Sequence, residues 1–257
     1  MDSDIERAAT LLLKSKYVTC LTGAGMSVES GIRPFRGPGG LWTEKGEPPM
    51  DGYQRFMKDP RKQWEEIVKG TGRDMGFYHA MAEAVPHEGH FGLAELEEMG
   101  VLKYLITQNI DNLHLLAGSK KVAEIHGNST KLRCVECNTR YEMDDISLDV
   151  LPPRCPKCKG IIKTDTVMFG EPIPYDVLLI CQREAAKSDC MLTVGTSVFV
   201  YPAAGFPLEV KRRGGILIEI NLYETEISDL CDVSLRGKAG EIIPALVDCV
   251  KRIQLHQ

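Results

Sequence analysis

Hydrophobic positions along the chain form two alternating patterns. Short apolar runs have the length and composition of buried strands, and they occupy residues 17–22, 101–107, 122–125, 190–194, 215–220 and 233–236. Apolar residues at helical spacing mark the segments between them, at 4–14, 93–99, 112–117, 175–187, 203–212 and 240–253. Strands that alternate with helices predict a parallel, doubly wound α/β sheet.

Two segments interrupt this alternation. Residues 46–92 hold helical pieces near 53–56, 63–69 and 77–84, with a glycine-rich break between the last two. Proline, histidine and glycine residues between 85 and 92 predict a turn at the end of the segment. Residues 129–165 contain two cysteine pairs, Pro152-Pro153 and short alternating stretches without a long helix. The sequence therefore predicts one sheet domain that carries smaller inserted modules.

Several of the predicted strands end in glycine or polar residues. Gly23-Ala24-Gly25 follow the first strand, and glycines between a strand and a helix bring backbone N–H groups close to a phosphate. Val28 stands where the third glycine of G-x-G-x-x-G belongs, so this motif alone is equally consistent with a tight turn. Other strands end at Gln108–Asp111, Gly195–Ser197 and Asn221. Because ligands gather at the carboxyl ends of parallel strands, these ends together predict a dinucleotide site.

A loop rich in glycine and proline follows the first glycines. It carries Phe35, Arg36 and Trp42, and its composition excludes a helix. Loops of this kind commonly close over a ligand.

The cysteines point to a metal. Four of the nine form C-x2-C-x17-C-x2-C, at Cys134, Cys137, Cys155 and Cys158. This spacing is typical of sites in which four thiolates surround Zn²⁺, and a closed shell of four thiolates leaves no position for chemistry. We expect one structural zinc ion rather than a redox pair or free thiols. An odd cysteine count also favours a reducing compartment.

Composition excludes some classes of protein. The 257 residues are 43% hydrophobic and 26% charged, as in ordinary globular proteins. A net charge of −5 argues against direct nucleic-acid binding. No apolar run approaches the roughly 20 residues of a membrane helix, and the charged N-terminus lacks the features of a signal peptide. We expect a cytoplasmic protein that does not bind membranes.

One histidine is a candidate base. Of the six histidines, His126 follows a predicted strand and precedes Gly127, where backbone can approach a ligand closely. A histidine with an ordinary pKa near 6.5 is able to act as a base at neutral pH. A single histidine is more often structural, so position alone leaves both interpretations open.

The ordered motifs identify a family. GAGMSVESGIRPFRGPGGLW, TQNID, EIHGN, the two C-x-x-C pairs, MFGEPIP and VGTSVFVYPAAGFP occur in the order seen in sirtuins, the NAD-dependent protein lysine deacylases. The tail SLRGKAGEIIPALV is similar to the end of microbial members. The resemblance covers nearly the whole chain and is weakest at 46–92.

The resemblance implies an architecture. A Rossmann-like doubly wound parallel sheet would comprise residues 1–35, 93–128 and 166–257. A smaller lobe would consist of the cofactor loop and helical insertion, 36–92, together with the four-cysteine zinc module, 129–165.

The resemblance also implies binding roles, position by position. Gly23, Ala24, Gly25 and Ser27 would hold the pyrophosphate and the adjoining ribose of NAD. Phe35 and Arg36 would cover the nicotinamide ribose, and Gln108, Asn109 and Asp111 would hold nicotinamide. The adenosine side would comprise Gly195, Thr196, Ser197, Asn221 and Ala239.

The remaining implied roles concern chemistry and substrate. His126 would be the general base, with Asn109 and Arg36 also in the catalytic set. An acyl-lysine protein or peptide would bind by strand addition, and the substrate-binding set would comprise Val167, Phe169, Gly170, Glu171, Val198 and Val200. The acyl oxygen would attack C1′ of the nicotinamide ribose as nicotinamide leaves. Neutral His126 would then take a proton from a ribose hydroxyl, and water would release lysine and O-acyl-ADP-ribose.

The chain departs from the sirtuin pattern in two places. Arg33-Pro34 replaces the usual Pro-Asp or Pro-Thr, which we expect to add a charge beside the cofactor and to alter loop closure. Ile67 and Gly70 occupy the positions of the Tyr-x-x-Arg pair that favours acidic acyl groups, although Arg73 lies close by. Acetyl or longer neutral acyl groups are therefore expected.

Other functions share the same site. A protein mono-ADP-ribosyltransferase would use the same NAD pocket, and a non-catalytic NAD-sensing protein would need no base. A nicotinamide-dependent dehydrogenase fits less well, because its third glycine and acidic ribose partner are missing.

Overall fold

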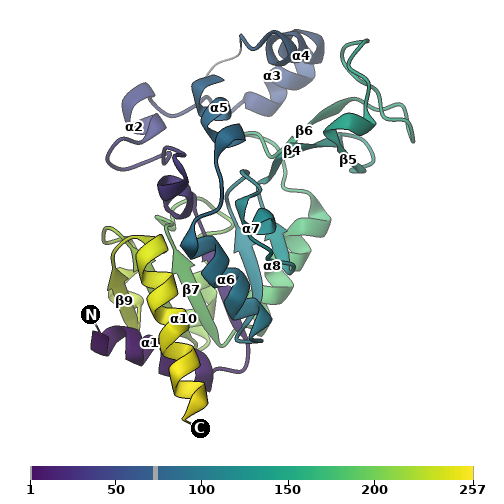
Figure 1. Cartoon of the computed structure of the whole chain (residues 1–257). Helices are drawn as coiled ribbons and strands as arrows, with labels where there is room; N and C mark the ends of the chain where they lie inside the picture. The colour runs from purple at the N-terminus through teal and green to yellow at the C-terminus, as the bar shows by residue number, and fades with distance from the viewer. Residues whose placement is uncertain (1, 72–74, 257) are drawn as a thin grey trace.

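The computed structural model describes residues 2–71 and 75–256. Its larger part is a six-stranded parallel sheet with the strand order β3-β2-β1-β7-β8-β9 (Figure 1). The strands are β1 Val18–Thr22, β2 Leu102–Thr107, β3 Val122–Glu124, β7 Cys190–Val194, β8 Ile216–Asn221 and β9 Val233–Arg236. Each lies within about one residue of a predicted apolar run, and the order is that of a Rossmann fold.

Helices cover both faces of this sheet. One face packs against α1 Asp2–Lys14, α6 Glu88–Glu98 and α10 Ala239–Leu255, and the other against α8 Tyr175–Lys187 and α9 Gly205–Arg212. Leu192 and Ile218 belong to the first core, whereas their strand neighbours Met191 and Leu217 belong to the second. Because side chains alternate across a strand, continuous apolar runs are what a sheet buried on both faces requires.

Helix α6 begins five residues before its predicted start. His87 caps it, since its Nδ1 atom accepts a hydrogen bond from the Gly89 N–H at 3.0 Å. A Cβ atom on Gly92 would lie 2.7 Å from Ile243 Cγ2 of α10. The glycines that suggested a turn therefore allow close packing between two helices, at a cost in helix propensity.

The smaller lobe combines two distant segments of the chain. An antiparallel sheet, β5-β4-β6, is built from β4 Gly127–Cys134, β5 Arg140–Glu142 and β6 Ile162–Thr166. Helices α3 Gly52–Lys58 and α4 Pro60–Lys69 share one core with this sheet, to which Phe56, Trp64, Leu132 and Ile162 belong. Trp64 Nε1 donates a hydrogen bond to the Ile162 carbonyl at 2.8 Å. The predicted fold class, a doubly wound sheet with a smaller lobe, is confirmed.

The lobe stands above the carboxyl end of the parallel sheet (Figure 1). Helix α5 Met75–Glu83 lies between the α3–α4 pair and the large domain, and α2 Leu41–Lys45 lies to its left in this view (Figure 1). The predicted glycine-rich break falls partly on residues 72–74, outside the described residues.

Candidate active site

The loops after β1 and β7 touch backbone to backbone. Gly25 N–H donates to the Gly195 carbonyl at 2.7 Å. A Cβ atom on Gly25 would lie 2.8 Å from Gly195 Cα, and one on Gly195 would lie 2.2 Å from the Met26 nitrogen. Gly195 also has φ +57°, a conformation that favours glycine. These glycines are therefore required where the strand order reverses, the position at which α/β sheets bind ligands.

The chain then enters a short 3-10 helix, η1 Ala24–Ser30, rather than an α-helix. The start of α10 lies beside it, because Gly240 N–H donates to Glu29 of η1 at 2.8 Å. Ala239, predicted on the adenosine side, is the buried first residue of α10.

Polar side chains connect the ends of the neighbouring strands. Gln108 Nε2, after β2, donates to Thr196 Oγ1 at 2.8 Å and to the Thr22 carbonyl at 3.2 Å. Asn221 Nδ2, at the end of β8, donates to the Thr196 carbonyl at 3.1 Å. The strand ends that the sequence singled out thus meet at one edge of the sheet.

A buried polar cluster lies beneath the η1 backbone. Asn109 Nδ2 donates to the Gly23 carbonyl and to Ser27 Oγ, each at 3.0 Å. Ser27 Oγ in turn donates to Asp111 Oδ2 at 2.6 Å. Burial raises the pKa of Asp111 above its ordinary value, and the hydrogen bond from Ser27 offsets part of that rise. Because the Ser27 hydroxyl is buried, donates to Asp111 and accepts from Asn109, it holds these two side chains in place.

His126 is held in one tautomer. Its Nδ1 atom lies 3.1 Å from the Gln108 carbonyl, which can only accept, so Nδ1 carries the proton and Nε2 keeps its lone pair. Burial lowers the pKa of His126 below the ordinary histidine value, while the bond to Gln108 acts in the opposite direction. Gly127 has φ +80°, and a Cβ atom there would lie 1.6 Å from the Asp165 carbonyl oxygen. The turn that carries His126 is thus fixed by contact with β6.

Aromatic rings order the glycine- and proline-rich loop. The loop was expected to contain no helix, but its last part forms α2, in which Trp42 is the second residue. Phe35 stacks on Trp42 with ring centroids 4.6 Å apart, and Trp42 contacts Phe169 edge-on at 5.5 Å. The Arg36 guanidinium lies 4.6 Å from the Trp42 ring centroid and pairs with Glu47 at 2.8 Å. The loop therefore has a defined shape, with Arg36 at its surface.

Arg33 is occupied within this loop. Its Nη2 atom donates to the Gly39 carbonyl at 2.9 Å and lies 2.6 Å from Glu44 Oε2 in α2. The charge that Arg33 was expected to add beside the cofactor is therefore paired with Glu44 in this conformation. Arg33 also closes the turn that Pro34 begins.

An open pocket of about 460 Å³ borders the same strand ends. It is lined by Arg36, Ser197, Phe199 and the loop residues Glu224, Thr225, Glu226 and Asp229. His126 and Asn109 do not line it, so the pocket marks the outer part of the site.

The two predicted substrate segments differ in their local geometry. Val167 N–H donates to the His126 carbonyl at 2.8 Å, and Tyr53 N–H donates to the Phe169 carbonyl at 2.9 Å. Among the described residues, the Val167 carbonyl and the Phe169 N–H have no protein partner. On the other side, Val198 has φ +53°, an unusual conformation for a β-branched residue, and Val200 accepts a bond from Ala204 N–H.

Glu171, expected in the substrate-binding set, has a buried side chain. It pairs with Arg133 at 2.6 Å and with Lys163 at 3.1 Å, so only its backbone is available to a peptide. Gly170, beside it, has φ +80° and contacts Gln54. These buried charges could not be foreseen, because Lys163 and Asp165 alternate with their neighbours along β6 as surface residues would.

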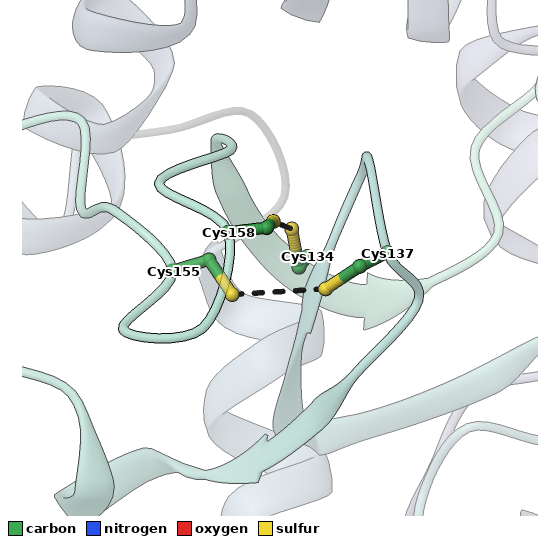
Figure 2. Close-up of side chains that lie close together, drawn as sticks. All are labelled: Cys134, Cys137, Cys155 and Cys158. Atoms are coloured by element: carbon green, nitrogen blue, oxygen red, sulfur yellow. Dashed lines mark hydrogen bonds between the residues drawn. The ribbon is translucent and has the colours of Figure 1, made fainter.

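The four predicted metal ligands converge. The Sγ atoms of Cys134, Cys137, Cys155 and Cys158 all lie within 4.8 Å of one another, and Figure 2 shows them pointing together, one from the end of β4 and the others from the loops that follow β4 and precede β6. Neighbouring pairs are 3.4 and 3.7 Å apart, close to the roughly 3.8 Å separation expected around tetrahedral zinc with bonds of about 2.3 Å. The donor set and its geometry fit one structural zinc ion, with no position left open.

The fold and the site together define a Rossmann-type protein whose strand ends form a nucleotide crevice beneath a four-cysteine module. The sequence profile of the Sir2 family matches residues 23–202. The chain therefore belongs to the Sir2 family.

Individual relatives match almost end to end. The chain is 42% identical to "NAD-dependent protein deacylase 1" of Archaeoglobus fulgidus, covering 96% of this chain and 98% of the relative. A solved Sir2 homologue in complex with NAD is 42% identical, with a TM-score of 0.78 and coverage of 96% and 94%. A Sir2 complex with a p53 peptide and NAD⁺ is 34% identical, with a TM-score of 0.76 and coverage of 95% and 97%.

Proposed function

We propose that this chain is an NAD-dependent protein lysine deacylase, which transfers the acyl group to ADP-ribose and releases nicotinamide. The observation that carries the proposal is His126, held with a bare Nε2 atom beside the meeting point of four strand ends. Full-length relatives named NAD-dependent protein deacylase support it.

The strand-end residues would hold NAD, which supplies the ribose that receives the acyl group. We assign the pyrophosphate to the backbone of Gly23–Ser27 and the adenosine side to Gly195–Ser197, Asn221 and Ala239. Gln108, Asn109 and Asp111 would form the nicotinamide pocket. Support comes from the direct backbone contact between the two glycine loops, which places these two sets of residues side by side.

His126 would act as the general base at Nε2. The Gln108 carbonyl orients the imidazole and keeps the proton on Nδ1, so a single residue serves both the nicotinamide pocket and the base. The Phe35–Arg36 loop would exclude water from the ribose, which strengthens electrostatic interactions with developing positive charge. Its aromatic contacts with Trp42 give it a preformed surface.

The acyl-lysine peptide would bind by strand addition. The Val167 carbonyl and the Phe169 N–H have free hydrogen-bonding capacity, and such backbone bonds read little side-chain sequence. Phe169 would line the acyl-lysine tunnel. Ile67 is 44% exposed on α4 and Gly70 ends that helix, so neither offers a cation to an acidic acyl group. Arg73 lies outside the described residues.

The domain boundaries, a cytoplasmic location and the lack of membrane and direct nucleic-acid binding also remain predictions. Among the described residues, no helix has the length and apolar character needed to cross a bilayer.

Incubation with NAD and a panel of acyl-lysine peptides tests the proposal. We expect free nicotinamide together with O-acyl-ADP-ribose, and loss of both in His126→Ala. ADP-ribose attached to protein would identify a mono-ADP-ribosyltransferase instead. NAD binding without turnover on any peptide would identify a sensor.

A further inference from the structure

Four charged side chains form a buried cluster between the zinc module and segment 167–171. Arg133 and Glu171 are each 4% exposed, Asp165 is 3% exposed and Lys163 is fully buried. Arg133 Nε pairs with Asp165 and Arg133 Nη2 with Glu171, each at 2.6 Å, while Lys163 Nζ lies 3.1 Å from Glu171. Two positive and two negative charges thus neutralise one another away from solvent.

Glu171 uses its second oxygen to shape the segment. Its Oε2 atom accepts a hydrogen bond from Met168 N–H at 2.9 Å, and its own N–H donates to the Met168 carbonyl at 2.9 Å. Residues 168–171 are therefore closed into one turn at both ends, and the carboxylate that closes the turn is tied to β4 through Arg133. The backbone N–H and carbonyl of Met168 are therefore both hydrogen-bonded. Among the described residues of this segment, the Val167 carbonyl and the Phe169 N–H remain available to pair with a partner strand.

The same cluster connects this edge to His126. Val167 N–H donates to the His126 carbonyl at 2.8 Å, and the Asp165 backbone fixes the Gly127 turn. The Asp165 carboxylate in turn holds both Arg133 and Arg140, the latter at 2.8 Å. One network thus reaches both the base and the backbone edge beside it.

Stability alone does not account for such a cluster. Removing charges from water is unfavourable, and apolar residues of similar volume often stabilise a protein as well or better. What a charged cluster adds is directional hydrogen bonding, which fixes geometry.

We propose that Glu171, held by Arg133 and Lys163, is a positioning residue that sets the peptide-binding edge of 167–171 relative to His126. The inference rests on the proposed function. It assigns to Glu171 an effect on peptide affinity that acts through the backbone of Val167 and Phe169, with no contact between its side chain and the substrate.

Glu184→Gln provides a matched control. The Glu184 side chain is 3% exposed, as buried as that of Glu171, and it also pairs with one arginine and one lysine, Arg183 at 2.8 Å and Lys187 at 3.0 Å, although these two side chains are exposed. It also accepts from Tyr17, which precedes β1, so it lies at the amino end of the sheet, away from the site.

The experiment compares Glu171→Gln with Glu184→Gln in the full-length zinc-loaded protein. Binding of a fluorescent acetyl-lysine peptide is measured by anisotropy, NAD binding by calorimetry and the unfolding midpoint by urea. We expect Glu171→Gln to weaken peptide binding on the order of tenfold and to leave the NAD Kd within about twofold. Glu184→Gln should lower the unfolding midpoint without changing peptide affinity.

The outcomes separate the two proposals. Equal peptide affinity in the two variants, or no peptide binding by the native chain, overturns the positioning role. Peptide binding without turnover contradicts deacylation but leaves the positioning test valid, since anisotropy needs no reaction. If Glu171→Gln does not fold, the double variant Lys163→Met/Glu171→Gln removes both charges of the pair, and the same loss of peptide affinity with intact NAD binding is expected.

Discussion

Gly195→Ala tests whether the two glycine loops need direct backbone contact. The new methyl group would lie 2.2 Å from the Met26 nitrogen and 2.5 Å from the Gly25 carbonyl carbon. These atoms belong to the backbone of the proposed phosphate site, so they cannot rotate away as a flexible side chain would. Either the η1 loop or the β7 loop must shift.

The cost has two parts that the chain allows us to separate. A left-handed conformation costs an alanine about 1–2 kcal/mol, and the stiffer unfolded chain returns about 0.4–1 kcal/mol. Overpacking adds about 1–3 kcal/mol. Gly214→Ala isolates the first part, because Gly214 has φ +80° and its new methyl group would have no heavy atom within 4 Å.

Urea unfolding of the two variants measures the difference. We expect Gly195→Ala to lose about 1–3 kcal/mol more free energy of unfolding than Gly214→Ala. For a protein of about this size, each kcal/mol lowers Tm by roughly 2–4 °C. NAD affinity, measured by calorimetry, should fall only in Gly195→Ala. Equal losses of stability, or an unchanged NAD Kd in Gly195→Ala, would show that the loops do not depend on this contact.

The base, the cofactor loop and the zinc module each allow a further test. First, burial lowers the pKa of His126, which must be neutral to act as the base. We therefore expect kcat/KM to stay constant as pH falls to about 6.5 and to decline only below that pH. A midpoint above 6.5 in the pH–rate profile contradicts this. Second, the double substitution Arg33→Pro and Pro34→Thr removes the contacts of Arg33 with Gly39 and Glu44. We expect the KM for NAD to change a few-fold. An unchanged KM would show that this departure from the sirtuin pattern has no effect on NAD binding. Third, removal of zinc by a chelator should unfold the small lobe, because Trp64 shares its core with two of the cysteine ligands. The fluorescence emission of Trp64 should then shift to longer wavelength. An unchanged spectrum after metal loss, which thiol titration verifies, contradicts a structural role of the zinc.

The fold could be predicted largely from sequence because a doubly wound sheet leaves a clear pattern. Strands buried on both faces appear as continuous apolar runs, and the polar residues that end them, such as Gln108 and Asn221, marked the crevice. The spacing of the four cysteines likewise predicted that their thiols converge on one metal ion. In each case the residues that determine the feature lie within a short stretch of the chain.

The misses came from contacts between distant segments. Gly89 and Gly92 suggested a turn, yet they serve the packing of α6 on α10. Arg33 was expected to add a charge beside the cofactor, and its pairing with Glu44 was missed because it depends on the folded loop. Glu171 belonged to a substrate motif, and its buried partners on β4 and β6 come together only once those strands pair.

His126 lies in the short connection between the parallel and the antiparallel sheet. Strand β3 of the parallel sheet ends at Glu124, and strand β4 of the antiparallel sheet begins at Gly127, so two residues of backbone join the two sheets. A rotation of the lobe against the large domain would change the backbone of this short connection, together with the longer connections before α3, before α6 and after β6, and the imidazole would turn with it. The ring resonances of His126 in a nuclear magnetic resonance spectrum should therefore report the angle between the two parts of the molecule.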